Sequence, residues 1–210
     1  DRIDLFFLHR FDDQTPLEET LRAVEDLVRS GKILYAGASN FAAWQVMKAL
    51  GLAALHHGSP LVCLQPMYSL VKRQAEVELL PLARAEGLAV IPYSPLGGGL
   101  LSGKYAPGVT PAGARLAVNP MYKTRYGDGW MVDAAARFAA LARARGLPPA
   151  ALAVAWLAAH PAVTAPIIGA RQVAQLEESL QAAAVAMTPD WRAELSALTP
   201  EPPPATDRND

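Results

Sequence analysis

Five short apolar runs along the chain are each followed by groups able to hydrogen-bond, to stack or to carry charge. These are His9 and Arg10, Ser39 and Asn40, Gln65 and then Tyr68 and Ser69, Tyr93 and Ser94, and 169–171. Hydroxyl and amide groups suit a carboxamide, and an aromatic face suits a flat heterocycle. A histidine in the same position can orient or polarise a carbonyl oxygen. The alternative for any single group is ordinary loop polarity, because Ser39 or Asn40 could simply cap the next helix.

Arg171 suggests the most specific physical role in this set. The sequence Gly169-Ala170-Arg171 leads into a predicted helix that starts near Val173. Free N–H groups at the N-terminus of a helix attract anions. A guanidinium group adds two parallel donors that match a phosphate monoester. The sequence therefore predicts a phosphate contact at Arg171, with a solvated surface arginine as the alternative.

The elements that must position these groups alternate regularly. Predicted strands cover 3–8, 33–37, 61–65, 88–92 and 163–168, and predicted helices cover about 16–30, 41–57, 73–86, 132–145, 149–159, 173–184 and 189–198. The glycine- and proline-containing stretch from Ser94 to about Trp130 is expected to be irregular. The first helix is expected to have Thr15 as its N-cap and Pro16 at its first position. The strands lack strict alternation of apolar and polar residues, which favours a parallel sheet buried on both faces by helices.

Two α/β architectures fit this order: an open doubly wound sheet and a closed (β/α)8 TIM barrel. The open sheet usually carries a G-x-G-x-x-G fingerprint after its first strand, and the triplet 97–99 has the wrong frame for it. A complete barrel needs about 250 residues, so 210 residues with five β/α units favour an incomplete barrel, strands four to eight of eight. This barrel segment is expected over 1–198, without its N-terminal strands, followed by a flexible proline-rich tail at 199–210.

Composition excludes several classes of function. With 19 basic and 20 acidic residues, the chain has no electrostatic footprint of a nucleic-acid binder. No apolar run approaches the roughly 18 residues of a membrane span, and no metal-ligand motif is present. The single cysteine, Cys63, is expected to be buried, which favours a reducing, cytoplasmic compartment.

Longer segments around these positions, taken together, resemble the aldo-keto reductase family in its bacterial and potassium-channel-β-subunit-like branches. The match covers nearly the whole chain to about residue 198. The segments that carry it are Asp4-Leu5-Phe6-Phe7-Leu8-His9-Arg10, Gly37-Ala38-Ser39-Asn40-Phe41, Gln65-Pro66-Met67-Tyr68-Ser69, the stretch from Tyr93-Ser94-Pro95-Leu96 to Gly103-Lys104-Tyr105, and Ile168-Gly169-Ala170-Arg171 to Gln175-Leu176-Glu177-Glu178.

The resemblance implies a barrel that binds NADP(H) and exchanges a hydride with a small-molecule carbonyl substrate. By position, it implies a catalytic, substrate-orienting role for His9. The implied cofactor-binding residues are Ser39, Asn40 and Gln65 at the carboxamide, Tyr93 stacked on the nicotinamide, Ser94, Leu96, Gly99, Ser102 and Lys104 at the pyrophosphate, and Gly169, Arg171, Gln175 and Glu178 at the adenosine phosphate and adenine. Ser179 stands where the family often has an asparagine, which weakens one expected adenine contact.

The family's proton-donating tyrosine, with its lysine and aspartate, belongs to the first three strands of the barrel. This chain starts at the strand that carries the histidine, so the resemblance implies that it lacks this acid and is inactive alone. An alternative is a non-catalytic NADP(H)-binding or regulatory module. An isomerase or aldolase barrel would place a lysine or paired carboxylates at the strand ends, and none of the five shows them. The sequence leaves the oligomeric state open.

Overall fold

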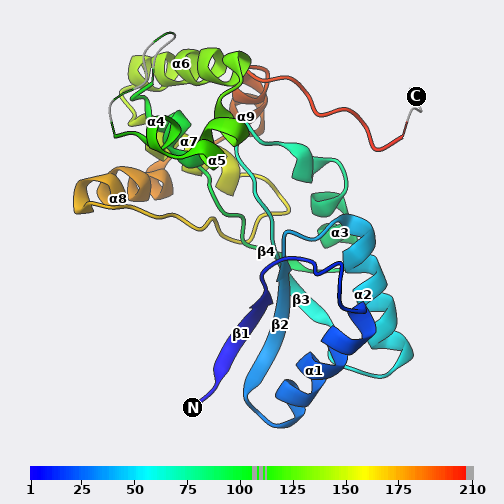
Figure 1. Ribbon diagram of the computed structural model, residues 1–210. Helices are drawn as coiled ribbons and strands as arrows, with labels where there is room; N and C mark the ends of the chain where they lie inside the picture. Colours follow the sequence, from blue (N-terminus) through cyan, green and yellow to red (C-terminus); the bar gives the residue numbers. More distant parts are fainter. Residues whose placement is uncertain (106–107, 109–110, 112, 207–210) are drawn as a thin grey trace.

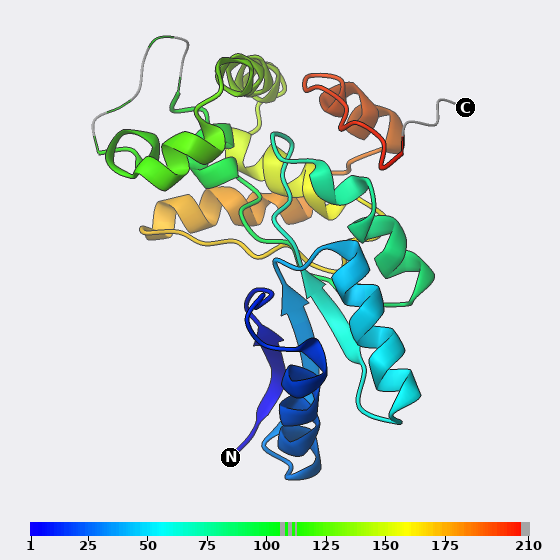
Figure 2. The same ribbon diagram turned by 45° about the vertical axis from the view of Figure 1, so that its right-hand side comes forward.

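A four-stranded parallel sheet forms one part of the computed structural model, which describes residues 1–105, 108, 111 and 113–206. Its strands are β1 (Ile3–Leu8), β2 (Ile33–Ser39), β3 (Leu61–Gln65) and β4 (Ala89–Val90), paired in chain order (Figure 1). Parallel neighbours require crossover connections, and α1 (Leu17–Arg29), α2 (Ala43–Leu55) and α3 (Leu79–Ala85) supply them. Helices α1 and α2 lie on the same side of β1 and β2 (Figures 1 and 2).

Two helix starts differ from the sequence prediction. Thr15 does not cap α1, because its hydroxyl donates to Asp12 Oδ2 at 2.7 Å and Pro16 occupies the N-cap position. The helix expected over 73–86 is a short 3-10 turn, η1 (Gln74–Glu76), followed by α3. Proline has no N–H and fits only the first turn of a helix. Pro81 therefore agrees with a helix that begins at Leu79.

The predicted fifth strand, over 163–168, is not a strand in the structure. This segment runs beside β4 and makes separate bonds to it: Thr164 N–H donates to Val90 O at 2.8 Å, and Ile167 N–H donates to Pro92 O at 2.9 Å. Pro92 and Pro166 carry no N–H, so neither can donate to a continuous ladder. The described residues thus contain a sheet of four strands, and the five-unit barrel is not confirmed.

A second, helical layer lies beyond the carboxyl ends of the strands (Figure 2). It contains η2 (Gly97–Ser102), α4 (Arg115–Val118), α5 (Pro120–Tyr126), α6 (Gly129–Ala144), α7 (Pro149–Ala158), α8 (Val173–Leu180), η3 (Gln181–Ala184) and α9 (Pro189–Ser196). The stretch 94–130, expected to be irregular, thus includes several short helices. Every residue of α7 from Ala150 to Leu157 is buried, so this helix forms the centre of the layer.

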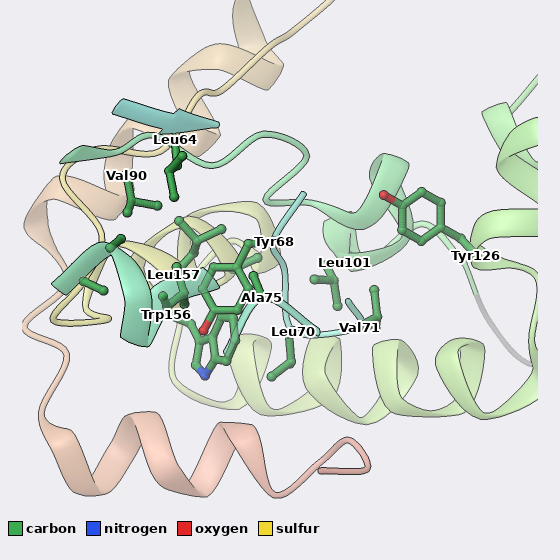
Figure 3. Close-up of a cluster of buried hydrophobic side chains, with 14 of the residues drawn as sticks. Leu64, Tyr68, Leu70, Val71, Ala75, Val90, Leu101, Tyr126, Trp156 and Leu157 are labelled. Carbon is green, nitrogen blue, oxygen red and sulfur yellow. The ribbon is translucent and has the colours of Figure 1, made fainter. Parts of the chain in front are cut away.

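The core joins the two layers through the segments that leave β3 and β4. Tyr68, Trp156, Phe138 and Tyr126 are its largest fully buried side chains. Figure 3 shows Tyr68 against Trp156, with Leu64 and Val90 of the sheet on one side of the cluster. The ring centroids of Tyr68 and Trp156 lie 5.3 Å apart. Aromatic pairs at this distance stabilise a core beyond their buried area, so the strand exits are firmly attached to α7.

The predicted tail begins with a packed residue. Thr199 is 7% exposed and its hydroxyl accepts from Arg73 Nη1 at 3.4 Å. The last residues of the tail, 207–210, lie outside the described part of the chain. Across the described residues, no helix has the length and apolar character needed to cross a membrane.

Candidate functional site

Residues at the carboxyl ends of β1, β2, β3 and β4 form one hydrogen-bonded cluster of side chains and main-chain carbonyls. Ser39 Oγ donates to the Gln65 carbonyl at 2.8 Å. Asn40 Nδ2 donates to the His9 carbonyl at 2.8 Å and to Ser39 Oγ at 3.0 Å. Tyr93 Oη donates to Asn40 Oδ1 at 2.7 Å. The carboxyl ends of parallel strands meet at one edge of the sheet, which is why residues so distant in sequence converge here.

Asn40 has a left-handed backbone conformation, with φ of 56°. Asparagine tolerates this region better than most residues. The conformation places its amide between the exits of β1 and β4, where it links His9 to Tyr93. His9 and Gln65 enter this cluster through main-chain oxygens, so the sequence correctly places them at this edge. The roles of the His9 imidazole and the Gln65 amide stay predictions from the resemblance.

A pocket of about 530 Å³ lies beside this cluster, between η2 and the start of α8. Every residue predicted for the phosphate and adenine end of the ligand lines it, although the residues come from segments some 70 positions apart. They are Ser94, Leu96, Gly99, Ser102, Lys104, Gly169, Arg171, Gln175 and Glu178. The structure therefore brings this half of the predicted set together around one open volume.

The pocket is positively charged. Lys104, Arg115 and Arg171 line it, with Glu178 as the carboxylate among its lining residues. Burial lowers the pKa of Lys104, and the nearby positive charges of Arg115 and Arg171 lower it further. Like charges held near one another in a partly buried site favour a bound anion that offsets their repulsion. The pocket is thus suited to a multiply charged ligand such as a phosphorylated nucleotide.

The wall formed by η2 depends on glycine. Gly98 has φ of 67°, and a Cβ atom there would lie 2.6 Å from the ring of Tyr122. Only glycine combines this conformation with so close a contact. Ser102 Oγ donates to the Gly99 carbonyl at 2.7 Å and closes the turn. The sequence Gly97-Gly98-Gly99, which carried little information by itself, therefore shapes one side of the pocket.

The opposite wall is the entry to α8. The Arg171 N–H donates to Gln175 Oε1 at 3.1 Å, so the Gln175 side chain fixes the loop that carries Arg171. Ser179 Oγ donates to the Gln175 carbonyl at 3.0 Å and is 3% exposed. Ser179 is therefore engaged within its own helix.

Sequence reasoning missed Arg115. It lies in α4, inside the stretch expected to be irregular, and it follows no strand exit. Its guanidinium group stacks over the Tyr122 ring at 5.3 Å, a contact that depends on the folding of two short helices onto η2. No local pattern in the sequence signals it.

Two further expectations concern residues outside the pocket. Tyr68, which the sequence places among the polar strand exits, is fully buried and does not line the pocket. Cys63 is buried as expected, and burial raises the pKa of its thiol to about 11. A thiol with so high a pKa is a poor nucleophile near neutral pH.

Comparison with known proteins places these features in a family. A family model described as "Aldo/keto reductase family" matches residues 1–199. The chain is 39% identical to the "Uncharacterized oxidoreductase YrpG" of Bacillus subtilis, over 96% of this chain and 60% of that protein. It is 37% identical to human "Aflatoxin B1 aldehyde reductase member 4", over 87% of this chain and 60% of that protein. It is 35% identical to a "Probable voltage-gated potassium channel subunit beta" of Arabidopsis thaliana, over 87% of this chain and 56% of that protein. The chain thus spans less than two thirds of the length of each of these relatives.

Proposed function

This chain belongs to the aldo/keto reductase family, and on that premise we propose that it binds NADP(H) for the reduction of aldehydes or ketones to alcohols. The observation that carries the proposal is the pocket, where all the residues expected at the phosphate and adenine end of the cofactor line one cationic cavity. The relatives named as an oxidoreductase and as an aldehyde reductase support the reaction class. The single buried Cys63 fits a reducing, cytoplasmic setting.

The residues of the pocket fit the charged half of the cofactor. Arg171, at the entry to α8, offers a bidentate contact for the 2′-phosphate. Lys104 and Arg115 would neutralise the pyrophosphate, beside the backbone of the glycine turn in η2. Gln175 and Glu178 would contact the adenine. In a partly buried site, fixed cations neutralise the phosphates of the ligand, so the affinity for NADP(H) should depend on each of these three cations.

The strand-exit cluster would hold the nicotinamide half. Ser39 and Asn40 are already hydrogen-bonded to Gln65 O, His9 O and Tyr93 Oη, so their orientations are set before a ligand binds. A carboxamide would use their remaining lone pairs or exchange one of these bonds. The Tyr93 ring, anchored by its hydroxyl, would stack on the nicotinamide. Such preorganisation lowers the entropic cost of binding.

Bound NADP(H) would supply the hydride, and the protein would orient the carbonyl and protonate its oxygen. His9 is the candidate for orienting the carbonyl. Among the described residues, the Tyr68 hydroxyl is engaged by Glu76 and the Tyr93 hydroxyl by Asn40. Neither of these two strand-exit tyrosines is therefore an available acid, and general acid catalysis contributes roughly 10²–10⁴-fold to rates. We therefore expect the 210-residue polypeptide alone to bind the cofactor but to turn over carbonyls slowly.

A second function, NADP(H) binding without catalysis in a regulatory module, is favoured by the relative named as a channel β subunit. The two functions share the pocket and differ in turnover. The tryptophan fluorescence of the protein is measured as NADPH is added, followed by assay of aromatic aldehyde reduction. Quenching at micromolar cofactor supports the proposal, and no quenching below millimolar cofactor contradicts both functions. Binding without turnover by a longer polypeptide that includes the family's tyrosine, lysine and aspartate would favour the regulatory module.

A further inference from the structure

A buried charged network joins the exit of β3 to the C-terminal helix α9. The Tyr68 hydroxyl donates to Glu76 Oε1 at 2.5 Å and accepts from Arg192 Nη2 at 2.7 Å. Glu76 also pairs with Arg73 Nη2 at 2.8 Å. The side chains of Arg73, Glu76 and Arg192 are only 11%, 18% and 19% exposed. Charges this far from water are kept in place by their partners, because an unpaired one would be costly.

Arg192 is fixed from several directions. Its guanidinium group lies over the Trp156 ring at 4.7 Å, and its Nε donates to the Trp156 carbonyl at 3.2 Å. The Trp156 indole nitrogen in turn donates to Ser196 Oγ at 3.0 Å. Figure 3 shows the Tyr68 hydroxyl and the Trp156 indole nitrogen pointing to the same side of the core. Helix α9 is therefore held against this side by bonds to both aromatic residues.

The main chain of Tyr68 continues this connection to the strand-exit cluster. Tyr68 N–H donates to the Tyr93 carbonyl at 3.3 Å, and Tyr93 N–H donates to the Pro66 carbonyl at 3.0 Å. The Tyr93 hydroxyl then reaches Asn40 at 2.7 Å. Three contacts thus link Arg192 to Asn40, although α9 lines neither the cluster nor the pocket.

We propose that Arg192 is a positioning residue, which through Tyr68 holds the exits of β3 and β4 in the geometry that receives the nicotinamide half of the cofactor. The inference rests on the proposed function. Helix α9 would then affect cofactor binding without touching the cofactor. Loss of the Arg192–Tyr68 bond would allow Tyr68 to shift, and Tyr93, which is bonded to the Tyr68 main chain, would shift with it. Lys104, Arg115 and Arg171, the cations that line the pocket, are not members of this network, so the phosphate end of the site is expected to be independent of the Arg192–Tyr68 bond.

The substitution Arg192→Met breaks the bonds to Tyr68 and Trp156 while its aliphatic chain still covers the Trp156 ring. Glu76 keeps Arg73 as its partner, so no buried carboxylate is left alone. Arg145→Met is the matched control, because Arg145 also binds α9, through Glu194 at 3.0 Å, but does not contact Tyr68. Tyr68→Phe removes the same bond from the other side, together with the bond to Glu76, which keeps Arg73 as its partner. Arg192→Lys keeps the charge.

Two ligands separate the halves of the site: NADPH, and adenosine 2′,5′-bisphosphate, which lacks the nicotinamide. Calorimetric titration of the full-length protein is expected to show about tenfold weaker NADPH binding for Arg192→Met and Tyr68→Phe, with the bisphosphate unchanged. Arg192→Lys is expected to recover part of the loss, and Arg145→Met to bind both ligands normally. Equal weakening of both ligands, or no weakening, overturns the proposal.

Amide hydrogen exchange on the ligand-free protein tests the connection without any cofactor. Arg192→Met should increase exchange at the Tyr68 and Tyr93 amides, whereas Arg145→Met should not. Unchanged exchange at both amides in Arg192→Met overturns the proposal even if folding is intact. If the unsubstituted protein binds neither ligand, the proposed function itself is wrong, and this role for Arg192 with it.

Discussion

The Tyr93 hydroxyl donates a 2.7 Å hydrogen bond to Asn40 Oδ1, and so connects the exits of β4 and β2 across the carboxyl edge of the sheet. Asn40 makes this bond from a left-handed backbone conformation, with φ of 56°. Asn40 therefore combines side-chain hydrogen bonds with an unfavourable backbone conformation, and two substitutions can measure the two contributions to stability separately.

Asn40→Gly should destabilise the protein less than Asn40→Ala. Both changes remove the bonds to His9, Ser39 and Tyr93. Only alanine adds the strain of a left-handed residue, which costs roughly 1–2 kcal/mol. Urea denaturation gives the two free energies of unfolding. Equal values would show that the backbone relaxes out of this conformation.

Gly37→Ala in β2 should destabilise the protein by about 1–3 kcal/mol, the usual cost of overpacking. A Cβ atom there would lie 2.5 Å from Phe7 Cε1 and 2.8 Å from the Cys63 carbonyl, and the carbonyl cannot rotate away. The matched control is Gly51→Ala in α2, where no atom beyond its chain neighbours and the adjacent backbone of its own helix lies within 4 Å of the added group. The control should gain about 0.5–1 kcal/mol from helix propensity. Thermal unfolding of both variants checks the pair, and a loss of stability in Gly51→Ala would contradict this account.

The strands illustrate what the sequence could and could not provide. The bounds of β1 and β3 were predicted correctly, because each is a short, mainly apolar run with clear limits, Arg2 and His9 for β1 and Pro60 and Pro66 for β3. The segment 163–168 has the same composition but does not form a strand. Its pairing depends on N–H groups that Pro92 and Pro166 lack, and on a neighbour, β4, that is only two residues long. Strand pairing depends on the N–H and C=O groups of two neighbouring segments, whereas the amino-acid composition of a segment describes that segment alone.

The candidate site shows the same division. Lys104 and Arg171 were predicted from motifs, and the structure places them on one pocket. Arg115 was not predicted, because its place at the pocket results from the packing of Tyr122 against Gly98. The Tyr68–Arg192 bond spans 124 positions and follows from the docking of α9. Contacts that arise from tertiary packing leave no local pattern in the sequence.

Arg171→Ala should weaken NADPH much more than NADH. If Arg171 contacts the 2′-phosphate, its removal costs a charge-assisted interaction of about 1.5–3 kcal/mol, or roughly tenfold or more in affinity. NADH has no such phosphate. Fluorescence titration with both cofactors measures the difference, and Arg29→Ala, on the exposed side of α1, is the control. Equal weakening of both cofactors would show that Arg171 does not contact this phosphate.

Inorganic phosphate should raise the Tm of the ligand-free protein, and Arg115→Ala should reduce this increase. Lys104, Arg115 and Arg171 repel one another, and the lowered pKa of Lys104 reflects that repulsion in addition to its burial. An anion bound only by the folded state stabilises it by mass action. Scanning calorimetry with increasing phosphate at constant ionic strength tests this expectation. An unchanged phosphate effect in Arg115→Ala would remove this residue from the anion site.

His160 should make the protein less stable as the pH falls from about 6.5 to about 4. Burial lowers the pKa of His160 to about 4 in the folded protein, and the positive charge of Arg192 adds to the effect. Its Nδ1 accepts from the Ala162 N–H at 3.1 Å, and its ring lies edge-on to Tyr68. Between these pH values the unfolded chain binds a proton that the folded chain does not. The free energy of unfolding therefore decreases as the pH is lowered.

His160→Asn keeps an acceptor for the Ala162 N–H but cannot bind that proton. Its stability should therefore fall less than that of the unsubstituted protein over the same interval. Glu76 contributes in the same direction, because its folded-state pKa is also lowered and its stabilising pairing is lost as acid protonates it. The His160 contribution is therefore the difference between the two urea-denaturation profiles measured from pH 7 to pH 4. Parallel profiles would mean that His160 titrates alike in the folded and unfolded chains, contrary to its place against Tyr68 and Arg192.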